Sequence, residues 1–193
     1  MQPPTMERST ASEAGAISER QLLRSARSGD RRAFAELVRH KLPGSYRFAA
    51  GVLGSDADAA DATQNAFIAA WRELPRYQDV DRFDAWLHRI LVNECRMQLR
   101  SATRRGLPAD DPERVGALVG AAAGSSARTE ALDLLERAFE QLAPDDRLLV
   151  VMHYLEHRPL TEAAVALRMP VGTAKVRLHE AREALERALG GVA

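Results

Sequence analysis

The stretch from Leu160 to Leu189 constrains the fold more than any other part of this chain. Its apolar residues recur at helical spacing in two runs, and the segment MPVG at residues 169–172 separates them. Pro170 cannot extend the first helix but can open the second, while Thr161 is a candidate N-cap and Gly190-Gly191 a stop signal. The pattern therefore predicts two helices that meet at a tight turn, which is the arrangement of a helix-turn-helix.

The second of these helices divides into two faces. The stripe from Ala174 through Leu178 to Ala181 is expected to be buried. The opposite face is polar and cationic, and we predict that it contacts DNA in the major groove through Thr173, Lys175, Val176, Arg177, His179 and Arg182. The alternative interpretation is an ordinary helical hairpin whose outer face is merely solvated.

The amino-acid composition is typical of a helical protein, and its charge balance is not that of a strongly basic protein. The chain has 193 residues, 46% of them hydrophobic and only 5% aromatic, which favours helices over strands. Lysine and arginine number 27, the same as aspartate and glutamate, so the net charge is zero. Proteins that bind nucleic acid alone usually carry a basic excess. The balance therefore indicates a DNA-binding protein that depends on a larger partner, or no DNA binding at all.

Other functional classes find little support. The single cysteine, Cys95, excludes an internal disulfide and is expected to fill a helix packing position. No phosphate-binding glycine loop, nucleophile elbow or metalloprotease helix occurs, and His153 and His157 lack a third ligand, so neither an enzyme nor a metal or other cofactor is predicted. Residues 1–15 form no signal peptide and no later run could cross a membrane, which predicts a cytoplasmic protein.

The N-terminal half reads as a series of amphipathic helices. Asp30 is expected to cap one helix, Pro43-Gly44 to interrupt it, and Ser55 with Asp58 to cap the next. That next helix, Asp56 to Leu74, carries four acids against one arginine. Its acidic and amide-bearing face is either a docking surface for a basic partner or simply solvated.

A basic segment with interleaved aromatic residues follows. A polar connection over residues 75–82 leads into a long helix from Phe83 to about Thr103, and the segment from Arg76 to Arg105 has seven arginines and four acids. Such a surface can follow a phosphate backbone and stack on bases. Phe83 is expected in the core instead, and the sequence leaves open whether Trp86 lies in the core or contacts bases.

Taken together, these motifs resemble a known family. They are, in order, Gly29-Asp30 with Ala33-Phe34; residues 58–67 (DAADATQNAF) with Ala70-Trp71; residues 83–87 (FDAWL) with Ile90 and Asn93; and residues 170–173 (PVGT) with Lys175, Arg177, Leu178, Ala181 and Arg182. The chain resembles a bacterial RNA polymerase sigma factor of the extracytoplasmic-function (ECF) group, a compact two-domain class.

The resemblance implies an all-α fold of two small helical domains joined by a flexible linker. Residues 1–16 would be a disordered tail, 17–104 sigma region 2, 105–129 the linker, which is rich in Ala, Gly, Ser and Pro, and 130–193 the helix-turn-helix region 4. The implied function is to bind core RNA polymerase and to direct promoter recognition and transcription initiation.

The resemblance also assigns the sites. Polymerase, through its β′ coiled coil, would bind Asp58, Asp61, Gln64, Asn65, Phe67 and Trp71, while the β flap would be a second contact. The residues that would bind the −10 element are Arg76, Tyr77, Asp79, Arg82, Trp86, Arg89, Asn93 and Arg96. The −35 element would be bound by the polar face of the second helix of the helix-turn-helix, from Thr173 to Arg182. An anti-sigma factor is a further expected partner, and no membrane contact is expected.

Two alternatives remain at this point. The first is an autonomous helix-turn-helix transcription regulator, which would bind promoter DNA without polymerase. The second is a helical interaction protein that has lost DNA binding. Glu180 and Glu183 favour it, because they lie where the family is commonly basic and would weaken phosphate contacts.

Overall fold

The structure is a computed structural model that describes residues 19–105 and 126–190. Every regular element in these ranges is helical, which confirms the predicted all-α fold. A helix over residues 19–27 is followed by α2 (Arg31–Leu53), α3 (Asp56–Glu73), the 3-10 turns η1 (Leu74–Arg76) and η2 (Val80–Arg82), α4 (Phe83–Arg105), α5 (Ser126–Gln141), α6 (Pro144–Val150), the π-helical turn η3 (Val151–Leu155), α7 (Leu160–Ala166) and α8 (Val171–Gly190). The expected tail over residues 1–16 and most of the expected linker lie outside the described residues.

The two N-caps predicted for α2 and α3 are confirmed. Asp30 accepts hydrogen bonds through its carboxylate from the backbone N–H groups of Arg32 and Ala33, at 2.8 and 3.2 Å. The Ser55 hydroxyl accepts one from the backbone N–H of Asp58 at 3.3 Å. Gly29 precedes the first cap with φ of 94°, a conformation that glycine adopts without strain. These signals place the starts of α2 and α3 from local chemistry alone.

The predicted interruption at Pro43-Gly44 is wrong, because α2 continues through both residues. A proline inside a helix costs roughly 3 kcal/mol, since it lacks an N–H and its ring crowds the preceding turn. Leu37 before it and Phe48 and Val52 after it are all buried. Burying both flanking turns outweighs the local cost, so tertiary packing keeps the helix continuous.

The helix-turn-helix is confirmed with one different boundary. Pro159, not Thr161, caps α7, and its carbonyl accepts hydrogen bonds from the backbone N–H groups of Glu162 and Ala163. Thr161 lies inside the first turn. The turn closes at Arg168, whose φ is 54°, and the Pro170 carbonyl accepts the first hydrogen bond of α8 from Ala174. Ala174, Leu178 and Ala181 are buried as expected.

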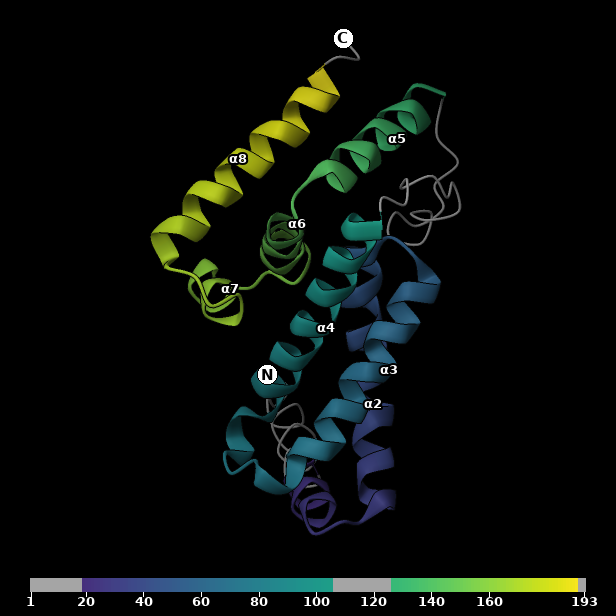
Figure 1. Cartoon of the computed structure of the whole chain (residues 1–193), viewed down its shortest axis with the longest axis vertical. Helices are drawn as coiled ribbons and strands as arrows, with labels where there is room; N and C mark the ends of the chain where they lie inside the picture. The colour runs from purple at the N-terminus through teal and green to yellow at the C-terminus, as the bar shows by residue number, and fades with distance from the viewer. Residues whose placement is uncertain (1–18, 106–125, 191–193) are drawn as a thin grey trace, which may run out of the picture.

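Two apolar clusters hold the helices together. The smaller one joins the helix over 19–27 to the start of α2, the end of α3 and the start of α4, and it includes Leu23, Leu37 and Leu87. The larger one runs from the other end of the α2–α4 bundle into α6, η3, α7 and α8. Figure 1 shows α6 beside α4, with the α2–α4 bundle in purple to teal and α5–α8 in green to yellow. The N-terminal and C-terminal helical regions therefore pack directly on one another.

Cys95 lies in the larger cluster and is fully buried, as expected for a packing residue. Burial raises the pKa of its thiol to about 12, and the Glu94 carboxylate adds to this. Since the thiolate is the reactive form, we expect iodoacetamide to leave Cys95 unmodified in the folded protein at neutral pH and to alkylate it after denaturation. Intact-mass spectrometry measures both states, and rapid labelling of the folded protein would contradict the assignment.

In the part of the chain that the structure describes, no helix combines the length and the apolar character needed to cross a bilayer.

Candidate functional sites

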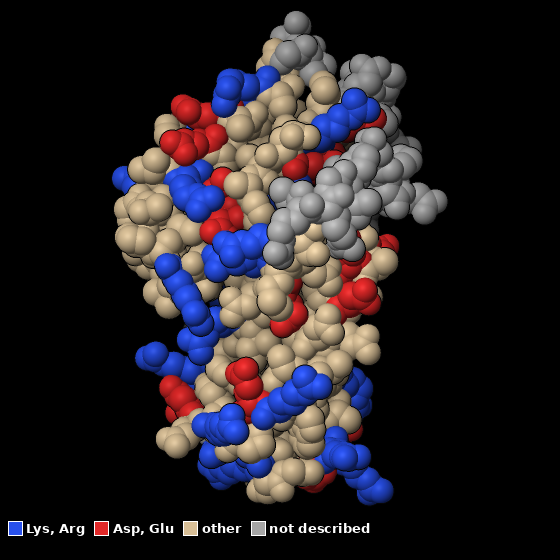
Figure 2. All heavy atoms as spheres, in the orientation of Figure 1, with Lys and Arg blue, Asp and Glu red and all other residues tan. Residues whose placement is uncertain are grey.

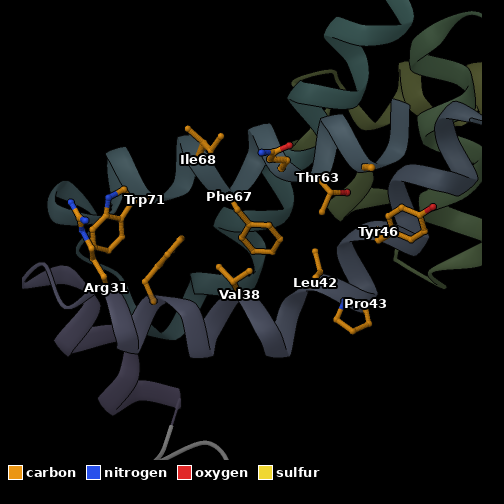
Figure 3. Close-up of a pocket in the computed structure, with 12 residues that line it drawn as sticks. Arg31, Val38, Leu42, Pro43, Tyr46, Thr63, Phe67, Ile68 and Trp71 are labelled. Atoms are coloured by element: carbon orange, nitrogen blue, oxygen red, sulfur yellow. The ribbon is translucent and has the colours of Figure 1, made fainter. Parts of the chain in front are cut away.

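An apolar groove of about 780 Å³ lies between α2 and α3. Figure 3 shows Val38 and Leu42 of α2 pointing toward Phe67 of α3, with Trp71 and Arg31 at one end and Tyr46 at the other. Leu42 is 43% exposed and Ile68, on the α3 side, is 41% exposed. The groove is thus an open apolar surface rather than a closed cavity, which is typical of a site that a partner covers.

The residues predicted to bind polymerase divide into two groups around this groove. Gln64, Phe67 and Trp71 line it, with Phe67 buried at 8% exposure and Trp71 packed on Phe34 at a ring-centroid distance of 4.9 Å. The remaining three, Asp58, Asp61 and Asn65, lie on α3 outside the lining. Asp61 and Asn65 are exposed, so they can contribute a polar rim.

Sequence reasoning missed the α2 wall of the groove. Phe34, Val38 and Leu42 recur every fourth residue and form one stripe. That spacing was visible in the sequence, and it predicts an apolar face, but it does not say whether α3 covers the face completely. Only the packing of the two helices reveals that part of the stripe stays open.

An aromatic cluster organises the start of α4. Tyr77 stacks on Trp86 at 4.4 Å between ring centroids, and Phe83 lies 5.7 Å from Trp86. Phe83 is buried, as expected, and Trp86 is only 8% exposed, which places it in the core as well. Trp86 presents no open ring face to a base in this arrangement. Its role in contacting the −10 element stays a prediction, and it would require Tyr77 to move.

Tyr77 covers this cluster from the connection before α4. Burial raises the pKa of its phenol, and the Asp79 carboxylate adds to the rise while Arg89 and Arg82 oppose it. The hydroxyl is buried without a hydrogen-bond partner among the described residues. The Tyr77 side chain as a whole is half-buried. Because its pKa is raised, the phenol is neutral at ordinary pH.

The other residues predicted for the −10 element are mostly accessible. Arg76, Asp79, Arg82 and Arg89 are exposed, and Asn93 is half-buried. Asp79 and Arg82 form a loose ion pair at 3.7 Å. Arg96 differs from these residues, because its Nε donates to Asp145 of α6 at 2.7 Å and its side chain is only 14% exposed.

Five of the six residues predicted for the −35 element are exposed on α8. Thr173, Lys175 and Val176 form its first turns, and Val176 is 56% exposed. Further along α8, His179 lies 3.3 Å from Glu183, and Arg182 lies 3.4 Å from Glu186. This face is accessible, but its second half carries its own acidic partners.

Arg177 is the exception on α8. Its Nε donates to Asp146 at 2.7 Å, and Nη1 lies 3.5 Å from Asp145. The hydrogen bond with Asp146 raises the pKa of the guanidinium above its usual value, against the effect of burial. Arg177 therefore ties α8 to α6, and its predicted base contact stays a prediction.

The visible surface is not uniformly basic. Figure 2 shows lysine and arginine side chains over both halves of this face, interspersed with acidic ones. A mixed surface of this kind is consistent with the zero net charge of the whole chain. It offers less non-specific attraction to nucleic acid than a continuous basic stripe would.

Comparisons with known proteins identify both helical regions. The Sigma-70 region 2 family matches residues 37–105, and the Sigma-70, region 4 family matches residues 132–185. The chain is 32% identical over 174 residues to the ECF RNA polymerase sigma factor SigM of Mycobacterium tuberculosis (strain ATCC 25618 / H37Rv), covering 90% of this chain and 85% of SigM. It is 30% identical over 184 residues to the ECF RNA polymerase sigma-E factor of Escherichia coli (strain K12), covering 88% and 93% of the two chains.

A solved structure agrees with these relatives. CnrH, solved in complex with the cytosolic domain of CnrY, superposes with a TM-score of 0.63 at 27% identity, covering 91% of this chain and 99% of CnrH. The chain belongs to the ECF RNA polymerase sigma factors, and it is therefore a transcription initiation factor. The comparisons favour neither the autonomous regulator nor the helical interaction protein.

Proposed function

We propose that the groove between α2 and α3 is the surface that binds core RNA polymerase. The single observation that carries this proposal is the exposure of apolar groups, Leu42 and Ile68 among them, along this groove. An amphipathic helix, such as one helix of the β′ coiled coil, fits an apolar groove of this kind, and the exposed Asp61 on the same helix α3 favours a partner with a basic flank.

The two DNA-contacting surfaces complete the proposal. The exposed face of α8, with Thr173, Lys175 and Val176 in its first turns, binds the −35 element in the major groove. The connection before α4 and the exposed arginines Arg82 and Arg89 bind the −10 element once its strands separate. The domains are residues 17–104 and 130–193, with a linker over 105–129.

The remaining partners follow from the same surfaces. An anti-sigma factor covers the groove and thereby competes with polymerase, and the solved complex of CnrH with CnrY supports a partner of this kind. The C-terminal domain contacts the β flap. The protein acts in the cytoplasm and has no catalytic chemistry of its own, because it supplies binding surfaces to an enzyme.

Run-off transcription with purified core polymerase tests this function. The template is a library with randomised −35 and −10 blocks, and the transcripts are sequenced to recover the preferred promoter. We expect transcription only when both the chain and core polymerase are present, with enrichment at both blocks. Tight binding of the same DNA by the chain alone would indicate an autonomous regulator, and no enrichment at either block would contradict a role in promoter recognition.

A further inference from the structure

Positive charge is concentrated at the start of the described chain, in the N-terminal helix (residues 19–27) and the first turn of α2. Residues 19–32 contain five arginines and two acids, although the chain as a whole has no net charge. Figure 2 shows several lysine and arginine side chains at the end of the molecule where Figure 1 places the N-terminal helix and the start of α2. The surfaces proposed to contact DNA include none of these five arginines.

Three of the arginines form a stripe along the N-terminal helix. Arg20, Arg24 and Arg27 follow one another at steps of four and three residues, which places them on one side of a helix. At a rise of 1.5 Å per residue, this arginine stripe is about 10.5 Å long. Leu23, on an adjoining side, is buried in the smaller apolar cluster and anchors the helix. Arg20 and Arg24 are exposed and Arg27 is half-buried.

The only acid of the N-terminal helix, Glu19, is bound to a different group. Its carboxylate lies 2.8 Å from Lys41 Nζ of α2, and the same Lys41 lies 2.7 Å from the Asp84 carboxylate of α4. Burial opposes the charge on Lys41, but its hydrogen bonds with Asp84 and Glu19 outweigh burial and raise its pKa. One lysine therefore ties the N-terminal helix to α2 and α4 and keeps Glu19 away from the arginine stripe.

Two arginines of the stripe lack an anionic partner. Among the described residues, no carboxylate pairs with Arg24 or Arg27, and the buried Nε of Arg27 has no hydrogen-bond acceptor. Guanidinium groups form their strongest hydrogen bonds with carboxylates and phosphates, often through two N–H groups at once. Unpaired guanidinium groups in a row favour a ligand with repeated negative charges.

The arginine stripe adjoins the connection before α4. Arg20 Nη2 lies 2.8 Å from the Asp81 carboxylate of η2, and the two side chains are 59% and 72% exposed. An ion pair this exposed contributes little free energy, so a phosphate can replace Asp81 at Arg20. A strand that leaves the proposed −10 surface past η2 meets Arg20 first, and then Arg24 and Arg27 on the following turns of the helix.

The length of the stripe suits a short piece of single strand. Phosphates of one stacked strand follow each other at about 3.4 Å along the axis, so a stripe of about 10.5 Å accompanies about three nucleotides. Side chains that bind phosphates give affinity and fix the path of the strand, but they carry no sequence information directly. The stripe has the charge and the length for this role.

We propose that the arginine stripe is a further nucleic-acid-binding site, which holds the phosphates of about three nucleotides that adjoin the −10 element on the separated strand. The placement of this strand next to the −10 element rests on the proposed function. Binding of a single strand by the stripe does not depend on it.

The first test measures the site itself. A fluorescently labelled thymidine oligonucleotide is titrated with the full-length chain, and anisotropy is followed over a range of salt concentrations. Arg24→Gln should weaken binding by roughly threefold or more at about 50 mM salt and lower the slope of log affinity against log salt by about 0.7, the value for one phosphate contact on a single strand. Adding Arg27→Gln should lower the slope about twice as much.

The chain offers two matched controls. Arg47 is exposed toward the other end of α2, where its Nε donates to the Pro43 carbonyl at 3.3 Å and its neighbour Phe48 joins the larger apolar cluster. Arg47→Gln removes the same charge, and it should leave both the affinity and the salt slope close to those of the wild type. Arg24→Lys keeps the charge at the stripe and should keep the salt slope.

The second test locates the strand. The chain bound to core polymerase is titrated with the single-stranded −10 block recovered by run-off transcription, either alone or lengthened by a few thymidines at its 5′ or its 3′ end. The wild type should gain roughly threefold or more in affinity from lengthening at one end, because each added phosphate contact releases counterions. Arg24→Gln should lose this gain and bind the block alone as the wild type does.

Several results would overturn the site. Unchanged affinity and slope for thymidine in a folded Arg24→Gln chain is one, and an equal loss in Arg47→Gln is another. A larger loss on duplex DNA than on the single strand would also contradict it. If the double variant fails to fold by circular dichroism, Arg24→Gln alone decides, because its side chain is exposed.

The placement next to the −10 element has its own outcomes. An equal gain from lengthening in the wild type and in Arg24→Gln would overturn this placement. If the thymidine results hold but the complex does not bind the −10 block at all, the stripe stands as a single-strand site, and the proposed function falls together with the placement.

Discussion

Replacing Ile68 by glutamate should weaken association with core RNA polymerase by about 2 kcal/mol or more, as truncation of a central interface residue does. Ile68 is 41% exposed on the wall of the α2–α3 groove, so a polar side chain can remain in water in the free protein. In the complex the same carboxylate would have to be buried against an apolar partner without a counter-charge. Titration of fluorescently labelled chain with core polymerase measures the loss.

The opposite wall and an unrelated surface provide the comparison. Leu42→Glu, at a residue that is 43% exposed on α2, should give a similar loss because one partner contacts both walls. Met97→Glu makes a similar change at a residue that is 54% exposed on α4, outside the groove lining, and should bind core polymerase normally. Equal affinities for all three folded variants would remove the groove from polymerase binding.

Much of the fold could be predicted because local chemistry decides it. The carboxylate of Asp30 and the hydroxyl of Ser55 cap α2 and α3 regardless of what packs on these helices. The apolar stripe of α8, from Ala174 to Ala181, follows from helical spacing alone. Such features need only residues close in sequence, so they are readable before any tertiary contact is known.

The error at Pro43 and the question left open at Trp86 both arise where tertiary packing decides the outcome. Pro43 ends a helix in isolation, but burial of Leu37 and Phe48 on either side keeps α2 continuous. Trp86 could have faced bases or the core, and its stack on Tyr77 depends on how the connection before α4 folds back. Neither result can be read from spacing, because each depends on how separate elements of the fold pack together.

The candidate sites also include features that follow from helical spacing and features that depend on tertiary contacts. Exposure of Lys175 and Val176 follows from the period of α8, and it agrees with the prediction. The pairing of Arg96 with Asp145 joins residues 49 positions apart. Sequence could mark Arg96 as a cation on a basic helix, but it could not show that α6 supplies the carboxylate that holds it.

The second large effect separates the two DNA-contacting surfaces by mechanism. Lys175 is exposed in the first turns of α8, so Lys175→Ala should weaken binding of the polymerase complex to duplex promoter DNA and reduce the salt slope by about one. The loss should be of similar size on a duplex whose −35 block is scrambled, because a phosphate contact does not depend on the base sequence. Filter binding over a range of salt concentrations measures both quantities.

Arg89→Ala should produce a different defect. Arg89 is exposed on α4, beside the connection proposed to hold the separated −10 strand. Its loss should leave duplex binding nearly intact and slow strand opening, and a template with a pre-melted −10 bubble should recover part of the rate, because unpairing has then already been done. Permanganate footprinting over time follows the opening step.

An arginine outside both DNA-contacting surfaces provides the control for these two variants. Arg39 is exposed on α2 and pairs with Glu36, so Arg39→Ala removes one positive charge at a distance from α8 and from the connection before α4. It should change neither the duplex affinity nor the opening rate beyond the small effect of net charge. If Lys175→Ala and Arg89→Ala gave the same defect on duplex and bubble templates, the chain would have a single DNA-binding surface. Separate defects, with Arg39→Ala close to wild type, would assign duplex recognition to α8 and strand opening to the start of α4.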